Sequence, residues 1–231
     1  MLAFLTADLP TIEGHAISRS AYYICPPVNR APLFWLISAL FLLAGGILLL
    51  FFQPEMATVF ANSHHTPWLD WFFKYYTQIA EWPVIVLALV LALLKHPITG
   101  FWAGITYGIE ALLINGLKLW FREPRPRVQL GIENMHQIDG VAILSGLSFP
   151  SGHTAAAFIG FGLISFMHPN KWIQVSAALG AILVGYSRMY LGQHYLRDVL
   201  GGEAIALLLL ALYALNYHRL HPVKLHSNHA V

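Results

Sequence analysis

The sequence is poor in charge and almost without cysteine. Only 10% of its residues are Asp, Glu, Lys or Arg, whereas a soluble domain carries about 25%. So few charges cannot cover a soluble surface, and a formal net charge of +2 provides no basic footprint for nucleic acid. The single cysteine, Cys25, excludes an internal disulfide and is expected to be a free thiol. What is abundant is apolar: 57% of the residues are hydrophobic, which predicts a membrane protein surrounded by lipid and without a nucleic-acid partner.

Six apolar stretches predict helices that cross the membrane. A spanning helix needs about 20 mostly apolar residues, and the second, fourth and fifth stretches are shorter than that. The stretches are Leu33–Phe52, Ile79–Leu94, Ile98–Leu117, Thr154–Met167, Trp172–Tyr186 and Val199–Tyr217. We therefore expect an all-α fold, an integral membrane bundle of six transmembrane helices, in which the whole chain, residues 1–231, forms a single domain.

Two further segments lie between these stretches. Pro54–Gln78 is rich in Trp and Tyr, which suit the headgroup level, so we expect it at the membrane interface. Lys118–His153 is long and polar, and the alternation of the spans places it on the same face as the short link 187–198. The face with 118–153 holds seven basic residues and the opposite face holds six. Three of the seven, Lys118, Arg125 and Arg188, are candidates for a phosphate site, and without them the count is four against six. This imbalance favours cytoplasmic termini.

Three clusters of basic and reactive residues meet on the face that contains 118–153. They are Lys118–Pro126, Pro150–His153 and Ser187–Asp198. Arg matches a dianionic phosphate through its bidentate fork and Lys does so as a point charge. Lys118, Arg125 and Arg188 therefore predict a phosphate site at this face.

The second cluster begins the fourth expected helix and adds donors to that site. A helix start presents free N–H groups and the positive end of the helix dipole, which together attract an anion. Ser151 adds a hydroxyl donor, and Gly152 lets the backbone approach the anion closely.

His194 and Asp198 are four residues apart, a spacing that puts two side chains on one helix face. The carboxylate can accept the Nδ1–H of the imidazole, which fixes the tautomer and leaves Nε2 free as a nucleophile. His153 then remains for proton transfer to the leaving oxygen. We expect His194 to lie at a solvated helix start, so that its replacement leaves the fold intact.

Each of these signals has an ordinary structural explanation when it is taken singly. A histidine at a helix end is usually structural, and Lys or Arg near the end of a span usually snorkels to the interface. The coincidence of all three clusters on one face favours chemistry over these explanations.

The three clusters resemble the signature motifs of the type 2 phosphatidic acid phosphatase (PAP2) superfamily, K-x6-RP, PSGH and SR-x5-H-x3-D. The first cluster has six residues between its Lys and its Arg-Pro pair, and the second is complete. The third has the required gaps of five and three residues. No defining position departs from the pattern, and the apolar stretches are similar in kind to that family's membrane layout.

The resemblance implies a role for each matched residue. His194 is the nucleophile that forms a phosphohistidine, Asp198 orients it, and His153 is the general acid. The residues implied to bind phosphate are Lys118, Arg125, Ser151, Gly152 and Arg188. A hydrolase without metal or cofactor is also implied, with its site at the extracytoplasmic face of the bacterial inner membrane. Its substrate would be a lipid phosphate such as phosphatidic acid, phosphatidylglycerol phosphate, undecaprenyl diphosphate or lipid A.

Three rival functions stay open at this point. A lipid phosphotransferase would use the same phosphohistidine and pass the group to another lipid, and only released inorganic phosphate separates the two. A non-enzymatic transporter would explain the basic residues but does not require both histidines and the aspartate in register. The related vanadium haloperoxidases share the pocket, but they are soluble, so the composition argues against them. Neither the lipid nor the oligomeric state follows from the sequence.

Several other polar residues have two interpretations. Glu110 lies inside the third expected span, where an ionisable group is costly, and is either functional or a protonated structural residue. Arg122 and Arg127 either contact a second phosphate or headgroup or anchor the interface. His64-His65 and the histidines of the tail have no Cys or carboxylate at metal-ligand spacing, so no metal site is predicted.

Overall fold

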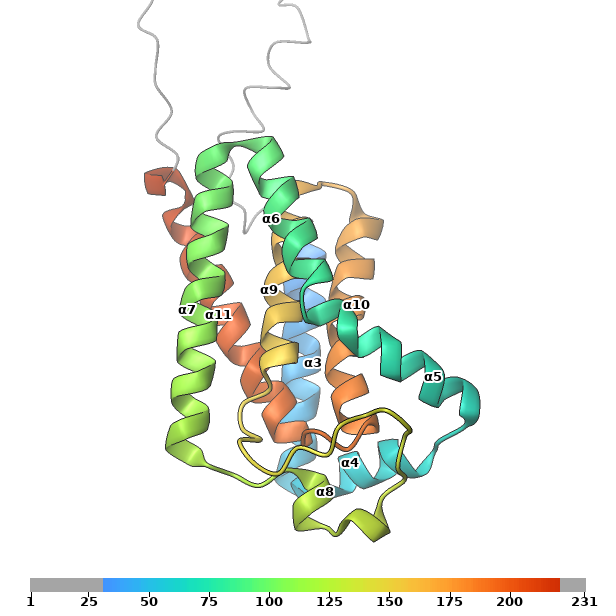
Figure 1. The fold of residues 1–231 in the computed structure, drawn as a ribbon. Helices are drawn as coiled ribbons and strands as arrows, with labels where there is room; N and C mark the ends of the chain where they lie inside the picture. The colour runs from blue at the N-terminus through green and yellow to red at the C-terminus, as the bar shows by residue number, and fades with distance from the viewer. Residues whose placement is uncertain (1–30, 221–231) are drawn as a thin grey trace, which may run out of the picture.

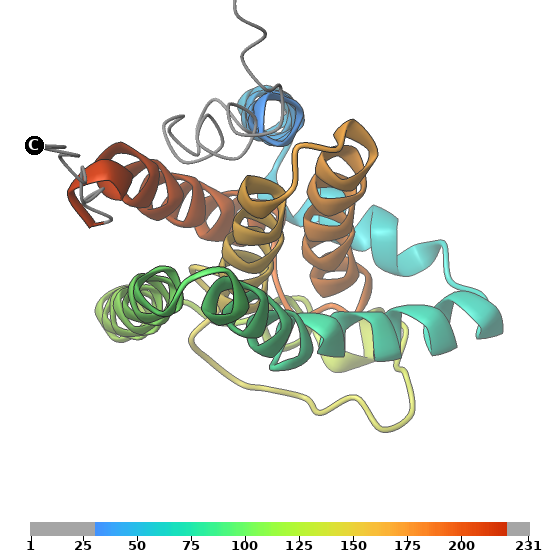
Figure 2. The ribbon, with the colours of Figure 1, turned by 90° about the horizontal axis from the view of Figure 1, so that it is seen from above.

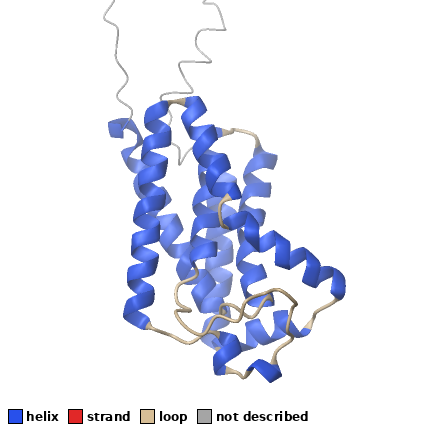
Figure 3. Cartoon of the chain, viewed as in Figure 1, coloured by secondary structure: helices blue, strands red, loops and turns tan. Residues whose placement is uncertain are grey.

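The computed structural model describes residues 31–220 and places side chains through residue 216. Cys25 and the histidines of the tail lie outside the residues whose side chains are described. Every regular element between 31 and 220 is helical, which confirms the expected all-α class for this part of the chain (Figure 3).

Long helices that run alternately up and down form the bundle (Figure 1). They are α3 (Pro32–Phe51), α6 (Pro83–Lys95), α7 (Pro97–Phe121), α9 (Gly152–Met167), α10 (Lys171–Tyr190) and α11 (Leu196–Leu220). In Figure 1, α3, α7 and α10 run toward the lower end, and α6, α9 and α11 return from it. The ends of α7 and α10 therefore share one end of the bundle with the starts of α9 and α11.

Short helical segments lie beside that same end or lead away from it. They are α4 (Pro54–Ser63), α5 (Pro67–Tyr76), η1 (Thr77–Ala80), α8 (Pro126–Gln129) and η2 (Ile132–Asn134). α5 diverges from the bundle (Figure 1) and leaves Trp68, Trp71 and Tyr75 exposed. This exposure suits the interfacial location that the sequence predicts for 54–78, and the location itself stays a prediction.

Prolines and polar caps explain where these helices begin. Proline occupies the first turn of α3, α4, α5, α6, α7 and α8, where its missing N–H costs nothing. The hydroxyl of Thr66 accepts from Leu69 N at 3.2 Å, and Asn170 Oδ1 accepts from Trp172 N at 2.8 Å. The same rule moves the start of the second expected span, because Pro83 begins α6 and 77–80 forms a tight 3-10 turn.

Four stretches are long and apolar enough to cross a membrane within the described part of the chain. They are Pro32–Phe51, Pro67–Lys95, Pro97–Gln129 and Leu196–Asn216, and Gly152–Met167 is a shorter apolar helix. α10 is 20 residues long but is not among them. Its polar side chains account for the difference, because residues such as Gln174 and Ser187, which are buried, lower its mean hydropathy. The expected count of six spans is thus not established by length and composition.

α9 lies at the centre of the bundle and packs against α6, α7, α10 and α11 (Figure 2). Small residues make this possible, because Ala155 and Ala157 are fully buried and Gly160 and Gly162 leave no room for a larger side chain. A Cβ at Gly162 would lie 2.5 Å from Leu210 Cδ1 of α11. Close packing around α9 fixes its first turn relative to α11, and this first turn carries part of the site.

Candidate functional site

Main-chain hydrogen bonds tie the separate clusters together at the lower end of the bundle. Ser151 N donates to Asp198 O at 2.9 Å, joining the start of α9 to the start of α11. Ser148 N donates to Glu123 O at 2.9 Å, joining the loop before α9 to the end of α7. A Cβ at Gly202 would clash with the carbonyl oxygen of Ser151, so the two helices touch backbone to backbone. The structure therefore brings the three predicted clusters to one place.

A tight turn after α10 delivers His194 into the site. Gly192 has a φ of +62°, a left-handed conformation that favours glycine. The turn folds back so that His194 N donates to Arg188 O at 3.2 Å. His194 precedes α11, and its side chain is only 1% exposed. The expectation of a solvated helix start is therefore wrong, because the loops 122–151 and 191–195 cover this end of the bundle.

The carboxylate of Asp198 contacts Nδ1 of the His194 ring. Its Oδ2 lies 3.3 Å from His194 Nδ1, accepts from Tyr195 N at 2.9 Å and accepts from the Ser148 hydroxyl at 2.5 Å. His194 lies before α11, so the four-residue spacing does not place the two side chains on one helix face. Instead, the Asp198 carboxylate caps the first turn of α11 and contacts His194 from there.

Arg125 approaches the free nitrogen of the same ring. Arg125 Nη1 lies 3.4 Å from His194 Nε2, and it is fixed by hydrogen bonds to Gln193 Oε1 at 3.0 Å and Gln193 O at 3.2 Å. Burial lowers the pKa of His194 well below its usual range, and the charges of Arg188, Arg125 and Lys118 lower this pKa further. The lowered pKa favours the neutral imidazole, and the contacts with Asp198 and Arg125 favour the tautomer with its proton on Nδ1 and its lone pair on Nε2.

The three predicted cations converge around His194. Arg188 is buried and donates from Nη1 to Thr77 Oγ1 at 2.7 Å, while its Nε has no hydrogen-bond partner within the described part of the chain. Lys118 is half-buried at the end of α7 and interacts electrostatically with Arg125, Arg188 and Asp198. Carboxylates also act on these cations: Asp198 and Glu110 on Lys118, and Glu81 on Arg188. The guanidinium and ammonium groups are donors of the kind that binds a phosphate dianion.

The first turn of α9 lies beside these cations. Ser151 is fully buried, and its Oγ accepts from Thr154 Oγ1 at 2.9 Å and from Thr154 N at 3.4 Å. The serine thus caps α9 and keeps its own hydroxyl proton for donation. A Cβ at Gly152 would meet Ile114 Cγ2 at 3.4 Å, an ordinary contact. The surrounding protein therefore does not demand glycine at 152, and close approach of a ligand stays the predicted reason for it.

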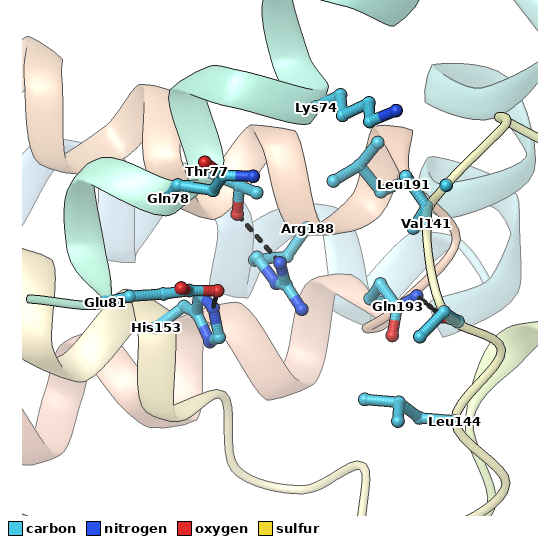
Figure 4. A pocket seen from close by; sticks show the side chains of 12 residues that line it. Lys74, Thr77, Gln78, Glu81, Val141, Leu144, His153, Arg188, Leu191 and Gln193 are labelled. Carbon is cyan, nitrogen blue, oxygen red and sulfur yellow. Dashed lines mark hydrogen bonds and ion pairs between the residues drawn. The ribbon is translucent and has the colours of Figure 1, made fainter.

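His153 opens onto a cavity of about 190 Å³ between η1, the end of α10 and the loop 140–144 (Figure 4). Figure 4 shows Glu81 against the His153 ring, and Glu81 Oε1 lies 3.3 Å from His153 Nε2. Arg188 reaches the same cavity, where its dashed bond to Thr77 is drawn. The cavity therefore connects the predicted general acid with one of the cations predicted to bind phosphate.

Sequence reasoning missed several of these contacts. Glu81 is 72 residues from His153 and Thr77 is 111 residues from Arg188. Ser148 and Gln193 stand within or beside the matched motifs without being part of their patterns. A polar residue at the start of an apolar stretch was the only available signal for Glu81.

The sequence left the roles of Arg122, Arg127 and Glu110 open, and these residues lie outside the group of side chains that contact His194. Arg127 is buried and donates to Gln137 Oε1 at 3.0 Å, so it braces the loop after α8 and is not an interface anchor. Arg122 ends α7 in a left-handed conformation, with a φ of 51°, and donates to Leu119 O. Glu110 is buried in α7, and Glu203 is buried in α11 with neither carboxylate oxygen hydrogen-bonded within the described residues.

Apolar helices with a buried histidine, a carboxylate and three cations gathered at one end define a helical integral membrane protein. Comparison with known proteins agrees. The profile of the PAP2 superfamily matches residues 99–222. Undecaprenyl-diphosphatase BcrC of Bacillus subtilis (strain 168) is 33% identical over 159 residues, which are 64% of this chain and 74% of that protein. Phosphatidylglycerophosphatase B of the same organism is 33% identical over 117 residues, 47% of this chain and 53% of its own length.

Two solved structures share the fold. Aquifex aeolicus LpxE has a TM-score of 0.61 and 28% identity, covering 69% of this chain and 93% of that one. The first transmembrane PAP2-type phosphatidylglycerolphosphate phosphatase from Bacillus subtilis has a TM-score of 0.59 and 26% identity, covering 86% and 99%. The chain belongs to the PAP2 superfamily.

Proposed function

We propose that this protein is a membrane phosphatase that hydrolyses a lipid phosphomonoester or diphosphate through a phosphohistidine at His194. The observation that carries the proposal is the state of the imidazole. It is buried, neutral, oriented by Asp198 on one side and aimed at Arg125 on the other. Homologues named as phosphatases of lipid phosphates support the same class of reaction.

Binding of the phosphate begins with charge. Lys118, Arg125 and Arg188 surround the position in front of His194 Nε2, and the Ser151 hydroxyl and Gly152 N–H add donors from the start of α9. Arg188 Nε, which has no hydrogen-bond partner among the described residues, is available to a phosphate oxygen. Hydrogen bonds hold Arg125, Arg188 and Ser151 before the substrate arrives, so these donors need little reorganisation as charge develops in the transition state.

The first chemical step is displacement at phosphorus. His194 Nε2 forms a P–N bond while the bond from phosphorus to the lipid oxygen breaks. His153 gives its proton to that leaving oxygen, and Asp198 stabilises the charge that appears on the His194 ring. In the second step a water molecule attacks phosphorus, His153 takes a proton from the water, and inorganic phosphate leaves with the P–N bond broken.

Glu81 extends this scheme beyond the motifs. Its carboxylate lies 3.3 Å from His153 Nε2 and is half exposed at the cavity. The contact fixes the orientation of the His153 ring, and the negative charge of Glu81 partly offsets the positive charges of Arg188, Lys118 and Arg125 near that ring. Glu81 therefore acts as a positioning residue for His153.

The membrane arrangement forms part of the proposal. We place six spans, α3, α6, α7, α9, α10 and α11, within one domain of residues 1–231 in the bacterial inner membrane. The alternating directions of these helices support that count, although α9 is short and α10 is polar inside. The termini are then cytoplasmic and the site extracytoplasmic, as the charge balance of the loops predicts. The reaction as written uses side chains and requires neither metal nor cofactor.

The test is a rapid-quench experiment with ³²P-labelled lipid phosphates and the full chain in detergent. The panel contains phosphatidic acid, phosphatidylglycerol phosphate, undecaprenyl diphosphate and lipid A. We expect an acid-labile, base-stable label on the protein that is lost in His194→Asn. Because His194 is buried, the melting temperature of the variant must stay near that of the parent.

Each alternative result has a distinct meaning. Label that persists in His194→Asn, or that maps to Ser151 or His153, contradicts the assigned nucleophile. Label transferred to a lipid without release of inorganic phosphate identifies a phosphotransferase. No label and no phosphate release across the panel favours a protein that only binds lipid phosphate.

A further inference from the structure

A second group of ligating side chains lies where α4, α5 and the loop after η2 meet. His65 follows α4, Asp70 is in α5, and His136 is in the loop after η2. One ligand atom from each residue lies within 4.8 Å of the others. None of the three lines the cavity that His153 and Arg188 share, so this cluster is separate from the phosphate site.

The surroundings hold two of the three ligands in place. His136 Nε2 lies 2.8 Å from Asp70 Oδ2, and His136 N donates to Asn62 Oδ1 at 2.8 Å. The hydroxyl of the buried Tyr190 donates to Asp70 Oδ1 at 2.6 Å. The carboxylate therefore has one oxygen fixed by the protein and the other directed at the histidine, as in sites where outer hydrogen bonds orient metal ligands.

The third ligand, His65, has an exposed side chain that can turn to complete the set. The rings of His65 and His136 stack with centroids 3.5 Å apart and planes 2° from parallel. A metal ion lies in the plane of the imidazole that binds it, so coordination requires the exposed His65 ring to turn. Tetrahedral Zn²⁺ with bonds of about 2.0–2.1 Å places its ligand atoms about 3.3 Å apart. The observed separations are within reach of that value by side-chain rotation alone.

The cluster borders a cavity of about 350 Å³ that is lined by His65, His136, Glu133 and Asn62 among others. Two imidazoles and one carboxylate suit Zn²⁺ rather than Mg²⁺ or Ca²⁺, which prefer oxygen ligands throughout. The cavity gives water access to a fourth coordination position. An ion here would join the α4–α5 corner to the loop 130–149, two segments that are far apart in the sequence.

We propose that His65, Asp70 and His136 form a binding site for a divalent transition-metal ion of the Zn²⁺ type. The ion cross-links the α4–α5 corner to the loop after η2 and stabilises the folded protein. It takes no part in the phosphatase reaction, because the ligands do not face His194 or the cavity of His153.

The test is titration of the chelator-treated full chain, purified without a histidine tag, with Zn²⁺ by calorimetry and with Co²⁺ by visible absorption. We expect one tight ion per chain at this site and a tetrahedral Co²⁺ spectrum. His65→Ala and His136→Ala should weaken that binding by more than the ~10–100-fold that loss of an outer hydrogen-bond partner costs. Zn²⁺ should raise the melting temperature of the parent and leave that of His65→Ala unchanged.

His64→Ala is the matched control, because His64 is the exposed neighbour of His65 and its ring rests on Phe60 instead. It should bind Zn²⁺ like the parent. Tight binding that survives both His65→Ala and His136→Ala places the ion elsewhere, for example on the histidines of the tail, and overturns the proposal. Equal losses in His64→Ala and His65→Ala, or no tight binding by the parent, overturn it as well. Phosphate release by all these variants monitors the proposed function independently.

Discussion

Replacement of Asp198 by asparagine tests how the tautomer of His194 is set. In the parent, Asp198 Oδ2 accepts from His194 Nδ1, Tyr195 N and the Ser148 hydroxyl. Asparagine keeps one acceptor oxygen for the Tyr195 N–H, so the first turn of α11 keeps its cap. That single amide oxygen has two lone pairs, which the Tyr195 N–H and the Ser148 hydroxyl fill at 2.9 and 2.5 Å. The longer contact of 3.3 Å to His194 Nδ1 then loses its acceptor, and the ring favours the proton on Nε2, where the nucleophilic lone pair is needed.

The size of the loss follows from that exchange. The corresponding Asp→Asn change in a serine-protease triad lowers kcat by ~10⁴. At about 1.36 kcal/mol per factor of ten this is roughly 5.4 kcal/mol of transition-state stabilisation. Ser148→Ala removes one hydrogen bond from the same carboxylate but leaves its acceptor role toward His194. A hydrogen bond to a charged group contributes about 1.5–3 kcal/mol, so that variant should lose roughly 10- to 150-fold, well short of the loss in Asp198→Asn.

The assay is single-turnover release of inorganic phosphate from a saturating lipid phosphate. It is accompanied by ¹⁵N NMR of the histidine rings, which reports the tautomer directly. We expect Asp198→Asn to shift the His194 proton to Nε2 and Ser148→Ala to leave it on Nδ1. A loss below about 100-fold in Asp198→Asn, or equal losses in the two variants, would refute this reasoning.

Four further predictions concern the same chain. His153→Ala should lower turnover less for substrates with acidic leaving groups, and Glu81→Gln should show the same trend more weakly; a loss that ignores the leaving group contradicts both roles. Phosphatase activity should survive EDTA, while orthovanadate should inhibit it; loss in EDTA with recovery in Mg²⁺ argues for a catalytic metal instead. Folding lowers the pKa of His194, so the unfolded chain binds a proton more readily than the folded protein does. The free energy of unfolding should therefore fall as the pH drops below the unfolded pKa of about 6.5, by up to about 1.4 kcal/mol per pH unit. Melting curves of His194→Asn should lack this part of the acid dependence. A reporter after Val231 should behave as cytoplasmic and one within 130–140 as exported, and the reverse pattern would invert the topology.

The sequence was sufficient for the parts of the site that depend on short spacings. One short segment carries Arg188, His194 and Asp198. Their spacing in the sequence was therefore enough to predict that these residues lie close together. Membership of the PAP2 superfamily, predicted from those spacings, is confirmed. The roles of the individual residues stay predictions.

Contacts between distant segments did not follow from the sequence. Glu81 reaches His153, and Asp70 reaches His136, across 72 and 66 residues without any pattern that links them. Burial of His194 was also missed, because hydropathy shows where a chain crosses lipid but not how polar loops fold over a helix end. For the same reason, the polar interior side chains of α10 make that helix look less like a span than its position suggests.

The hydrogen bond from Ser151 N to Asp198 O has a consequence for how this protein tolerates change. This main-chain bond sets the distance between the start of α9, which is proposed to donate to phosphate, and the segment before α11 that carries His194. No side chain takes part in it. Side chains around it can vary without moving the two apart, whereas any insertion between 151 and 198 must leave both ends of this bond in place. The connection 168–170, at the opposite end of the bundle, meets that condition (Figure 1). It is therefore the position at which the chain can accept an inserted tag or domain with the reacting groups still in register.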